Sequence, residues 1–141
     1  AKHRRQEMIR SIMEGVAFSL KDSLGIIQEM GLPIEEIRLA GGGAYSSLWR
    51  QIIADVFEFP VTITNIQEGP AYGAALLASV GVGIYQDVGE VCDQRIKAIE
   101  VLDPLLENKN LYRANYQLYK KLYPTLKDVF SESAVNPIEE M

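Results

Sequence analysis

Three consecutive glycines, Gly41 to Gly43, and a serine three residues later, Ser46, have types and spacing that suit binding chemistry. Because glycine lacks a Cβ, a ligand can approach the backbone closely at such a run. A helix that begins near Ser46 would add free backbone N–H groups and a partial positive charge, which favour a phosphate. No carboxylate lies between Ala40 and Asp55 to repel an anion. The pattern predicts a turn that binds an anion or a nucleotide, and a tight turn without a ligand explains the glycines equally well.

Other phosphate-binding patterns do not fit this stretch. A dinucleotide fingerprint requires glycine at the position of Ser46, and the sequence has no Gly-Lys-Ser or Gly-Lys-Thr triplet. Two carboxylates, Asp55 and Glu68, are candidates for a base, but we interpret both as structural hydrogen-bonding residues. The sole histidine, His3, and the sole cysteine, Cys92, form no metal cluster, and we expect Cys92 to be a buried small hydrophobic residue.

The elements that flank the glycines must hold them in place. Residues 37–40 are a short, partly β-branched run that predicts a strand leading into the turn. Ser46 or Ser47 can cap the helix that follows, which ends before Pro60. One face of this helix is apolar, and its side chains recur at helical spacing: Trp49, Ile52, Ile53, Val56 and Phe57.

The remaining elements alternate along the chain in an order that predicts the fold class. They are a helix over residues 8–30, a strand over 61–64, a helix over 70–80, a short helix capped by Asp87, an extended segment over 99–102 and a last helix over 108–130. Such alternation predicts an α/β fold with parallel strands covered by helices. So few strands make a thin sheet with exposed edges, so we expect the fold to be partial and its other strands to belong to a longer protein.

Three of these helices carry more specific expectations. In the first we expect a buried apolar stripe, which consists of Ile9, Ile12, Val16, Leu20, Leu24 and Ile27. The helix over 70–80 is rich in small residues, so a neighbour should approach its backbone closely. In the last helix we expect the tyrosines to pack half-buried and Pro124 to cause a kink or a break. Residues 1–130 should form one domain, and 131–141 a disordered tail.

Composition limits the partners. A chain of 141 residues with 48% apolar and 23% charged residues suits one globular domain. Its net charge of −5, without a basic block, disfavours nucleic acid. No apolar run reaches the roughly 18 residues of a spanning helix, and no signal-peptide core is present, so we expect a cytoplasmic protein with no membrane partner. The charged opening runs directly into a helical pattern, as expected of a segment cut from a longer protein.

Two ordered motifs suggest a family. The first comprises Leu39, Ala40, Gly41, Gly42, Gly43, Ala44, Ser46, Trp49, Gln51, Ala54, Asp55, Pro60 and Val61. The second is the stretch from Glu68 to Ala78, which contains glycine and several alanines. Together they resemble the adenosine motif and the following helix of the FGGY carbohydrate kinases, and Trp49-Arg50-Gln51 is most similar to the xylulose kinases of that family. With the flanking helices, the resemblance covers residues 4 to about 130.

The resemblance implies a ribonuclease-H-like (actin-like ATPase) domain and a site for ATP or ADP. The whole enzyme would transfer the γ-phosphate of ATP to a ketose hydroxyl, converting D-xylulose to D-xylulose 5-phosphate. By position, Gly41, Gly42 and Gly43 would lie against the α-phosphate and ribose, and Ser46 near the adenine, although Tyr45 departs from the family pattern. The catalytic base, most of the Mg²⁺ contacts and the sugar site belong to upstream segments, so this chain should contribute no catalytic or metal-binding residue and be inactive alone.

Two alternatives stay open at this point. The sugar could be another substrate of the family, such as glycerol, gluconate, ribulose or rhamnulose, because the residues that contact it lie mainly outside this chain. The chain could instead be a nucleotide-binding module of the actin and Hsp70-like superfamily that phosphorylates no sugar, since such modules share the glycine turn. Exposed strand edges also allow a homodimer.

Overall fold

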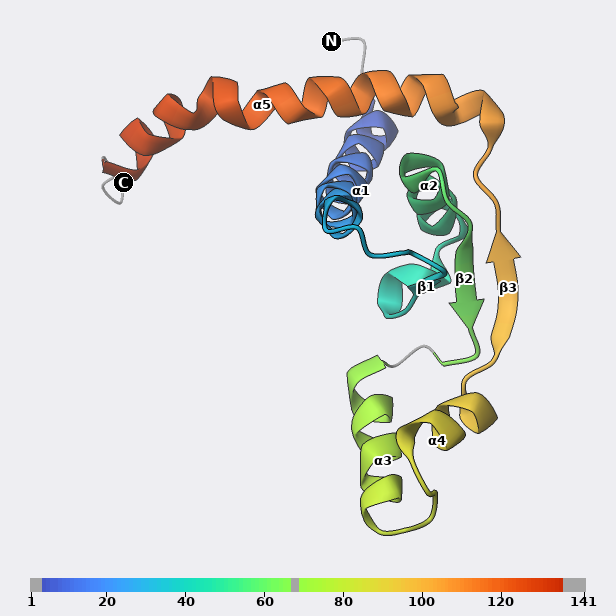
Figure 1. Ribbon diagram of the computed structural model, residues 1–141. Coiled ribbons are helices and arrows are strands. Elements are labelled where there is room, and N and C mark those ends of the chain that lie inside the picture. Colours follow the sequence, from blue (N-terminus) through green and yellow to red (C-terminus); the bar gives the residue numbers. More distant parts are fainter. Residues whose placement is uncertain (1–3, 67–68, 136–141) are drawn as a thin grey trace.

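The computed structural model describes residues 4–66 and 69–135, arranged as helices around a small sheet (Figure 1). The helices are α1 (Arg5–Glu29), α2 (Ser47–Phe57), α3 (Gly69–Gly81), α4 (Val88–Arg95) and α5 (Lys109–Val135), with short 3₁₀ helices η1 (Gly42–Tyr45) and η2 (Leu106–Asn108). The strands are β1 (Ile37–Leu39), β2 (Val61–Thr64) and β3 (Ala98–Leu102). This order confirms the predicted strand, glycine turn and helix.

The strands form one mixed sheet with β2 in the middle. β1 pairs in parallel with β2, placing Ile37 opposite Val61, whereas β3 runs antiparallel, with Leu102 opposite Val61. All four residues of β2 are buried, as suits a central strand, but Ile99 and Val101 of β3 are 61% and 59% exposed. The α/β class is confirmed, but the expected parallel arrangement holds only for β1 and β2.

The helices α3 and α4 explain why β3 is reversed. Both lie beyond the C-terminal end of β2, so the chain returns to the sheet at the end where β2 finishes (Figure 1). Asn65 fixes this return: its backbone N–H donates to the Lys97 carbonyl (2.9 Å), and its side-chain oxygen accepts from the Lys97 N–H (2.7 Å). The Asn65 amide nitrogen also donates to the Arg95 carbonyl (3.0 Å). A strand that begins there can pair with β2 only by running back along it.

The core is centred on α2. Ile52, Ile53 and Val56 are each 1% exposed, which confirms the predicted apolar face. Phe18 of α1 and Tyr112 of α5 pack against this face, and α5 crosses the ends of α1 and α2 (Figure 1). Burying an aliphatic side chain of this size contributes roughly 1.5–3 kcal/mol. The helix that follows the glycine turn is therefore the most firmly packed one.

The face that α1 buries differs from the expected stripe. Ile12 is 68% exposed, and Ile9, Val16, Leu20 and Ile27 are exposed as well. The buried residues of α1 are Ala17 and Phe18, which face the core around α2 and α5. The helix is apolar on two faces, and periodicity alone does not say which one the rest of the fold covers.

The close neighbour expected for α3 is not found among the residues that the structure describes. α3 has no buried residue and packs on α4. A Cβ added to Gly73 would meet no described atom within 4 Å. Within the described residues, the small side chains of α3 therefore leave an open face.

The last helix continues through Pro124 and ends at Val135. Proline removes one backbone hydrogen bond without ending the helix, which bends toward its C-terminal end (Figure 1). Residues 131–135, assigned by the sequence to a disordered tail, are therefore helical, and the rest of that tail lies outside the described residues. Within the described part of the chain, no helix is both long and apolar enough to span a membrane.

Glu58, the residue that caps the C-terminal end of α2, joins α2 to α1 and α5 through ion pairs. Its carboxylate lies 3.4 Å from the Lys21 Nζ, 3.4 Å from the Lys109 Nζ and 2.7 Å from the Arg113 Nη2. The hydrogen bond from Arg113, more than the charge of Lys21, lowers the pKa of Glu58 from its ordinary value to about 2.

The wild-type chain should therefore be more stable than Glu58→Gln by about 1–2 kcal/mol at neutral pH. The gain is no larger because the cationic partners are exposed and water screens their charges. Because the folded state lowers the pKa, this advantage is complete above pH of about 5 and is lost as the pH falls toward about 2. Urea unfolding of both proteins across this range measures the difference. A difference that does not change with pH would contradict the assigned ion pairs.

Candidate functional site

The glycine turn lies at the C-terminal end of β1 and leads directly into α2. Its residues form the 3₁₀ helix η1, in which the Ala44 N–H donates to the Gly41 carbonyl at 3.0 Å. The Ser46 N–H then donates to the Gly43 carbonyl at 3.1 Å. The sequence predicted the turn but not its 3₁₀ form, because three glycines permit many backbone conformations.

The three glycines differ in conformation and surroundings. Gly41 has φ of +84°, a conformation that side chains with a Cβ rarely adopt. A Cβ on Gly42 would meet nothing within 4 Å, so a ligand can reach its backbone. A Cβ on Gly43 would lie 2.9 Å from the Trp49 indole, so this glycine is required for packing. Gly41 and Gly42 therefore leave an open backbone surface, called the cradle below, whereas Gly43 packs against Trp49.

Ser46 is the N-cap of α2. Its Oγ accepts a hydrogen bond from the Trp49 N–H at 3.3 Å, which confirms the predicted cap. The hydroxyl proton remains available to a ligand acceptor, because a serine Oγ can donate and accept at once. Tyr45, directly before Ser46, is 63% exposed. The structure therefore brings all four predicted residues together, and their contacts with a ligand stay a prediction.

Arg50 also contributes to the turn, a role that the sequence did not predict, although Arg50 belongs to the family resemblance. Its Nε donates to the Ala44 carbonyl within η1, and its Nη1 lies 2.6 Å from the Glu100 carboxylate of β3. The signal in the sequence was its position four residues after the capping serine, one helical turn into α2. Glu100 could not be identified from the sequence because its approach depends on β3 running antiparallel.

Asp55 is a structural residue, as expected. It is 2% exposed, and its carboxylate accepts hydrogen bonds from the Gln51 side chain, the Leu105 N–H and the Asn108 side chain, each at 2.7 Å. The bonds from Leu105 and Asn108 fix the connection between β3 and α5 to α2, whereas Gln51 lies within α2 itself. The second candidate carboxylate, Glu68, lies outside the described residues, and Cys92 is half-buried rather than buried.

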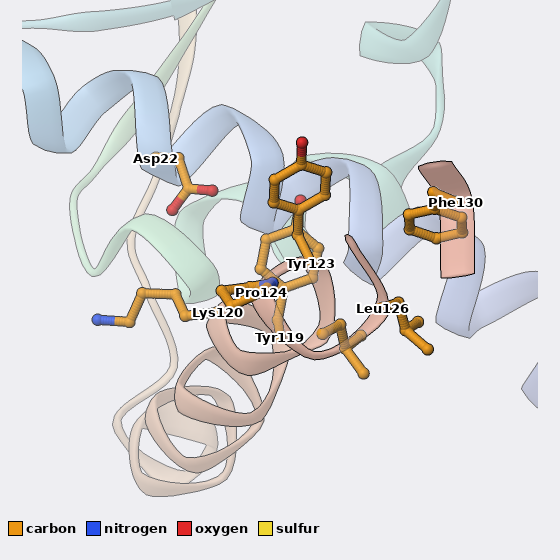
Figure 2. Close-up of a pocket in the computed structure, with 8 residues that line it drawn as sticks. Asp22, Tyr119, Lys120, Tyr123, Pro124, Leu126 and Phe130 are labelled. Atoms are coloured by element: carbon orange, nitrogen blue, oxygen red, sulfur yellow. The ribbon is translucent and has the colours of Figure 1, made fainter. Parts of the chain in front are cut away.

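Two hollows differ in their relation to the turn. One, of about 180 Å³, is lined by Ala40, which precedes the glycines, and by the ends of β1 and β2 and the first turns of α3. The other, of about 710 Å³, is an apolar groove between Asp22 of α1 and the C-terminal half of α5 (Figure 2). Tyr119, Tyr123 and Phe130 line this groove, and no residue of the glycine turn does. The smaller hollow therefore adjoins the turn through Ala40, although none of Gly41 to Ser46 lines it.

The described residues hold no evident site for a directly bound metal. Across residues 4–66 and 69–135, no group of three or more His, Cys, Asp or Glu side chains is placed to hold a metal ion. The donors that the turn offers are backbone N–H groups and hydroxyls, which suit an anion.

Comparison with known proteins gives the family. The model of the FGGY family of carbohydrate kinases, C-terminal domain, matches residues 1–82, which is more than half of the 141 residues. The xylulose kinase of Bacillus subtilis (strain 168) is 35% identical over 127 residues, covering 90% of this chain. The L-xylulose/3-keto-L-gulonate kinase of Escherichia coli (strain K12) is 32% identical over 127 residues, also 90% of the chain.

Solved structures agree with the sequence matches. The ligand-bound xylulose kinase from Lactobacillus acidophilus has a TM-score of 0.78 and 27% identity over 92% of this chain, and the match covers 26% of that protein. The chain likewise spans only 26% of each of the two relatives named above. These likenesses confirm the expected ribonuclease-H-like fold class and favour a kinase over a module that phosphorylates no sugar. The chain belongs to the FGGY family of carbohydrate kinases.

Proposed function

We propose that this chain is the nucleotide-binding part of an ATP-dependent sugar kinase. The observation that carries the proposal is the open backbone at Gly42, which follows the positive φ of Gly41 at the C-terminal end of a parallel strand. The N-terminus of α2 adds a partial positive charge that favours phosphate. Membership of a carbohydrate kinase family makes ATP or ADP the nucleotide that best explains this cradle.

We assign separate roles to the residues of the turn. The backbone at Gly41 and Gly42 would lie against the α-phosphate and ribose of the nucleotide. Ser46 would lie near the adenine, where its hydroxyl proton can be donated while its oxygen caps α2. Gly43 would act indirectly, because Trp49 occupies the space on its Cβ side.

Transfer of the phosphoryl group would require the rest of the parent protein. The chain spans 26% of the matched relatives, and phosphoryl transfer needs a base, a metal ion and in-line positioning held together. Mg²⁺ would be held mainly through the ATP phosphates and by residues outside this chain. Asp55 cannot serve as the base, since its carboxylate is buried and engaged by three donors.

We propose D-xylulose as the sugar, converted to D-xylulose 5-phosphate. The 35% identity to a xylulose kinase supports this substrate, and the 32% identity to an L-xylulose/3-keto-L-gulonate kinase makes those sugars a second candidate. Glycerol, gluconate, ribulose and rhamnulose remain further alternatives within the family. Measuring ADP release by the full-length protein with each sugar distinguishes them, and release with none of them would contradict the kinase assignment.

Substituting Gly42 tests the nucleotide site. We expect Gly42→Val to weaken ADP and ATP binding at least about tenfold, because its side chain would occupy the open space that the ligand needs. Isothermal titration calorimetry of the full-length protein measures this affinity. Stability should change little, since a Cβ at this position meets no neighbour.

Two control variants distinguish a loss of affinity caused by a blocked nucleotide site from one caused by a destabilised protein. Gly43→Ala should lower the stability of the protein, because the added Cβ would lie 2.9 Å from Trp49. Gly25→Val, in α1, also adds a side chain in open space but should leave the affinity unchanged. Full nucleotide affinity in Gly42→Val would contradict the proposed cradle.

A further inference from the structure

Arg50 holds the glycine turn against the sheet. Its Nε donates to the Ala44 carbonyl, and its Nη1 lies 2.6 Å from Oε2 of Glu100. The Arg50 side chain is 19% exposed and that of Glu100 45% exposed. One guanidinium thus connects the 3₁₀ turn, the first turns of α2 and the strand β3.

This contact fixes the orientation of a peptide group in the turn. Ala44 donates its N–H to the Gly41 carbonyl at 3.0 Å, and its own carbonyl accepts from Arg50. Both polar backbone groups of Ala44, which is 6% exposed, are therefore engaged. The Trp49 indole packs against Gly43, the residue directly before Ala44.

A run of three glycines needs such support from outside. Glycine loses more conformational freedom on folding than other residues, so Gly41 to Gly43 have little tendency to keep one shape by themselves. The planar guanidinium presents its donors in a fixed fork, which suits two acceptors at once. Arg50 supplies this constraint without covering Gly42, whose Cβ side stays open.

We propose that Arg50 is a positioning residue for nucleotide binding and that Glu100 orients it. By fixing the Ala44 peptide, Arg50 keeps the backbone at Gly41 and Gly42 in the shape that receives the phosphate and ribose. The inference rests on the proposed nucleotide site and adds to it a determinant on β3, a strand that does not belong to the turn.

The test compares variants of the full-length protein. For Arg50→Met we expect the Kd for ADP and the KM for ATP to rise about tenfold, with the KM for the sugar unchanged. Arg50→Lys should recover part of this loss, because a single ammonium can reach one acceptor well but not both. Glu100→Gln should raise the Kd about threefold, because its exposed carboxylate acts only through Arg50.

Amide hydrogen exchange gives a readout that does not depend on the ligand. Exchange at Ala44 and Ser46, whose N–H groups close the turn, should become faster in Arg50→Met and in Glu100→Gln. The control is Arg113→Met, which removes an arginine–carboxylate pair at the opposite end of α2. It should leave both the exchange at these amides and the nucleotide affinity unchanged.

A charge-swapped double variant distinguishes positioning of the turn by Arg50 from general stabilisation of the fold by an ion pair. Arg50→Glu combined with Glu100→Arg can restore an ion pair between α2 and β3 but cannot donate from position 50 to the Ala44 carbonyl. We expect its unfolding midpoint to recover toward wild type while its nucleotide affinity stays weak. Recovery of the affinity together with the stability would overturn the positioning role.

The outcomes also separate the inference from the function on which it rests. A wild-type protein that binds neither ADP nor ATP would overturn the proposed nucleotide site itself. Wild-type binding with an unchanged Kd in Arg50→Met and Glu100→Gln would overturn only the role of Arg50. Should Arg50→Met fail to fold, Glu100→Gln still decides the question, because its side chain lies at the surface.

Discussion

Replacing Asp55 with alanine is expected to lower the free energy of unfolding by about 3 kcal/mol, roughly 1 kcal/mol for each hydrogen bond lost. The carboxylate is 2% exposed and accepts from the Leu105 N–H and from the side chains of Gln51 and Asn108, each at 2.7 Å. Without it, donors in a part-buried region lose their acceptor. The connection between β3 and α5 should then detach from α2. Denaturant unfolding followed by circular dichroism measures the loss.

The isosteric variant Asp55→Asn should restore part of this stability. Its amide oxygen can accept from the Gln51 side chain and the Leu105 N–H, which donate to the same carboxylate oxygen, whereas its NH₂ group would face the Asn108 amide donor. Asp128→Ala, on the exposed surface of α5, serves as the control and should change stability by no more than about 0.5 kcal/mol. Equal stability of Asp55→Ala and Asp128→Ala would mean that Asp55 is not the structural residue described here.

Replacing Phe18 with alanine should lower the free energy of unfolding by about 3–4 kcal/mol. Phe18 is 5% exposed and joins α1 to the tyrosines of α5, with ring centroids 6.3 Å from Tyr112, 5.8 Å from Tyr116 and 5.5 Å from Tyr119. The variant loses the buried area of the ring and leaves a cavity between two helices. Denaturant unfolding and the protection of α1 amides from exchange both measure this effect.

Tyr123 provides the matched control for Phe18. It belongs to the same row of tyrosines but is 65% exposed, so Tyr123→Ala should change stability by less than about 1 kcal/mol. The expected half-buried packing thus applies to Tyr116 and Tyr119, whereas Tyr112 is buried and Tyr123 is not. A similar loss in both variants would show that the aromatic contacts with α1 are not what stabilises α5.

Local signals in the sequence predicted the parts of the site that are close together along the chain. Ser46 caps α2 through a contact with Trp49, three residues away, and Asp87 caps α4 in the same manner, accepting from the Glu90 N–H at 2.9 Å. The strand before the glycines and the apolar face of α2 depend likewise on neighbouring residues. Such features require only local geometry, which composition and spacing encode directly.

The features that the sequence did not predict depend on distant contacts. The direction of β3 follows from the return at Asn65 and Lys97, which are 32 residues apart. The partner of Arg50 lies 50 residues away on that same strand. The exposed stripe of α1, which includes Ile12, shows that an apolar periodicity does not identify the face that other elements cover. The strand direction, the partner of Arg50 and the buried face of α1 thus all depend on tertiary contacts.

The packing of Trp49 against Gly43 also gives the protein an intrinsic spectroscopic probe. Trp49 is the only tryptophan in these 141 residues, and its indole lies directly beneath the glycine turn. Indole emission responds to the polarity and rigidity of its surroundings. Within this chain, the fluorescence of a single native residue therefore reports the conformation of the turn without any label.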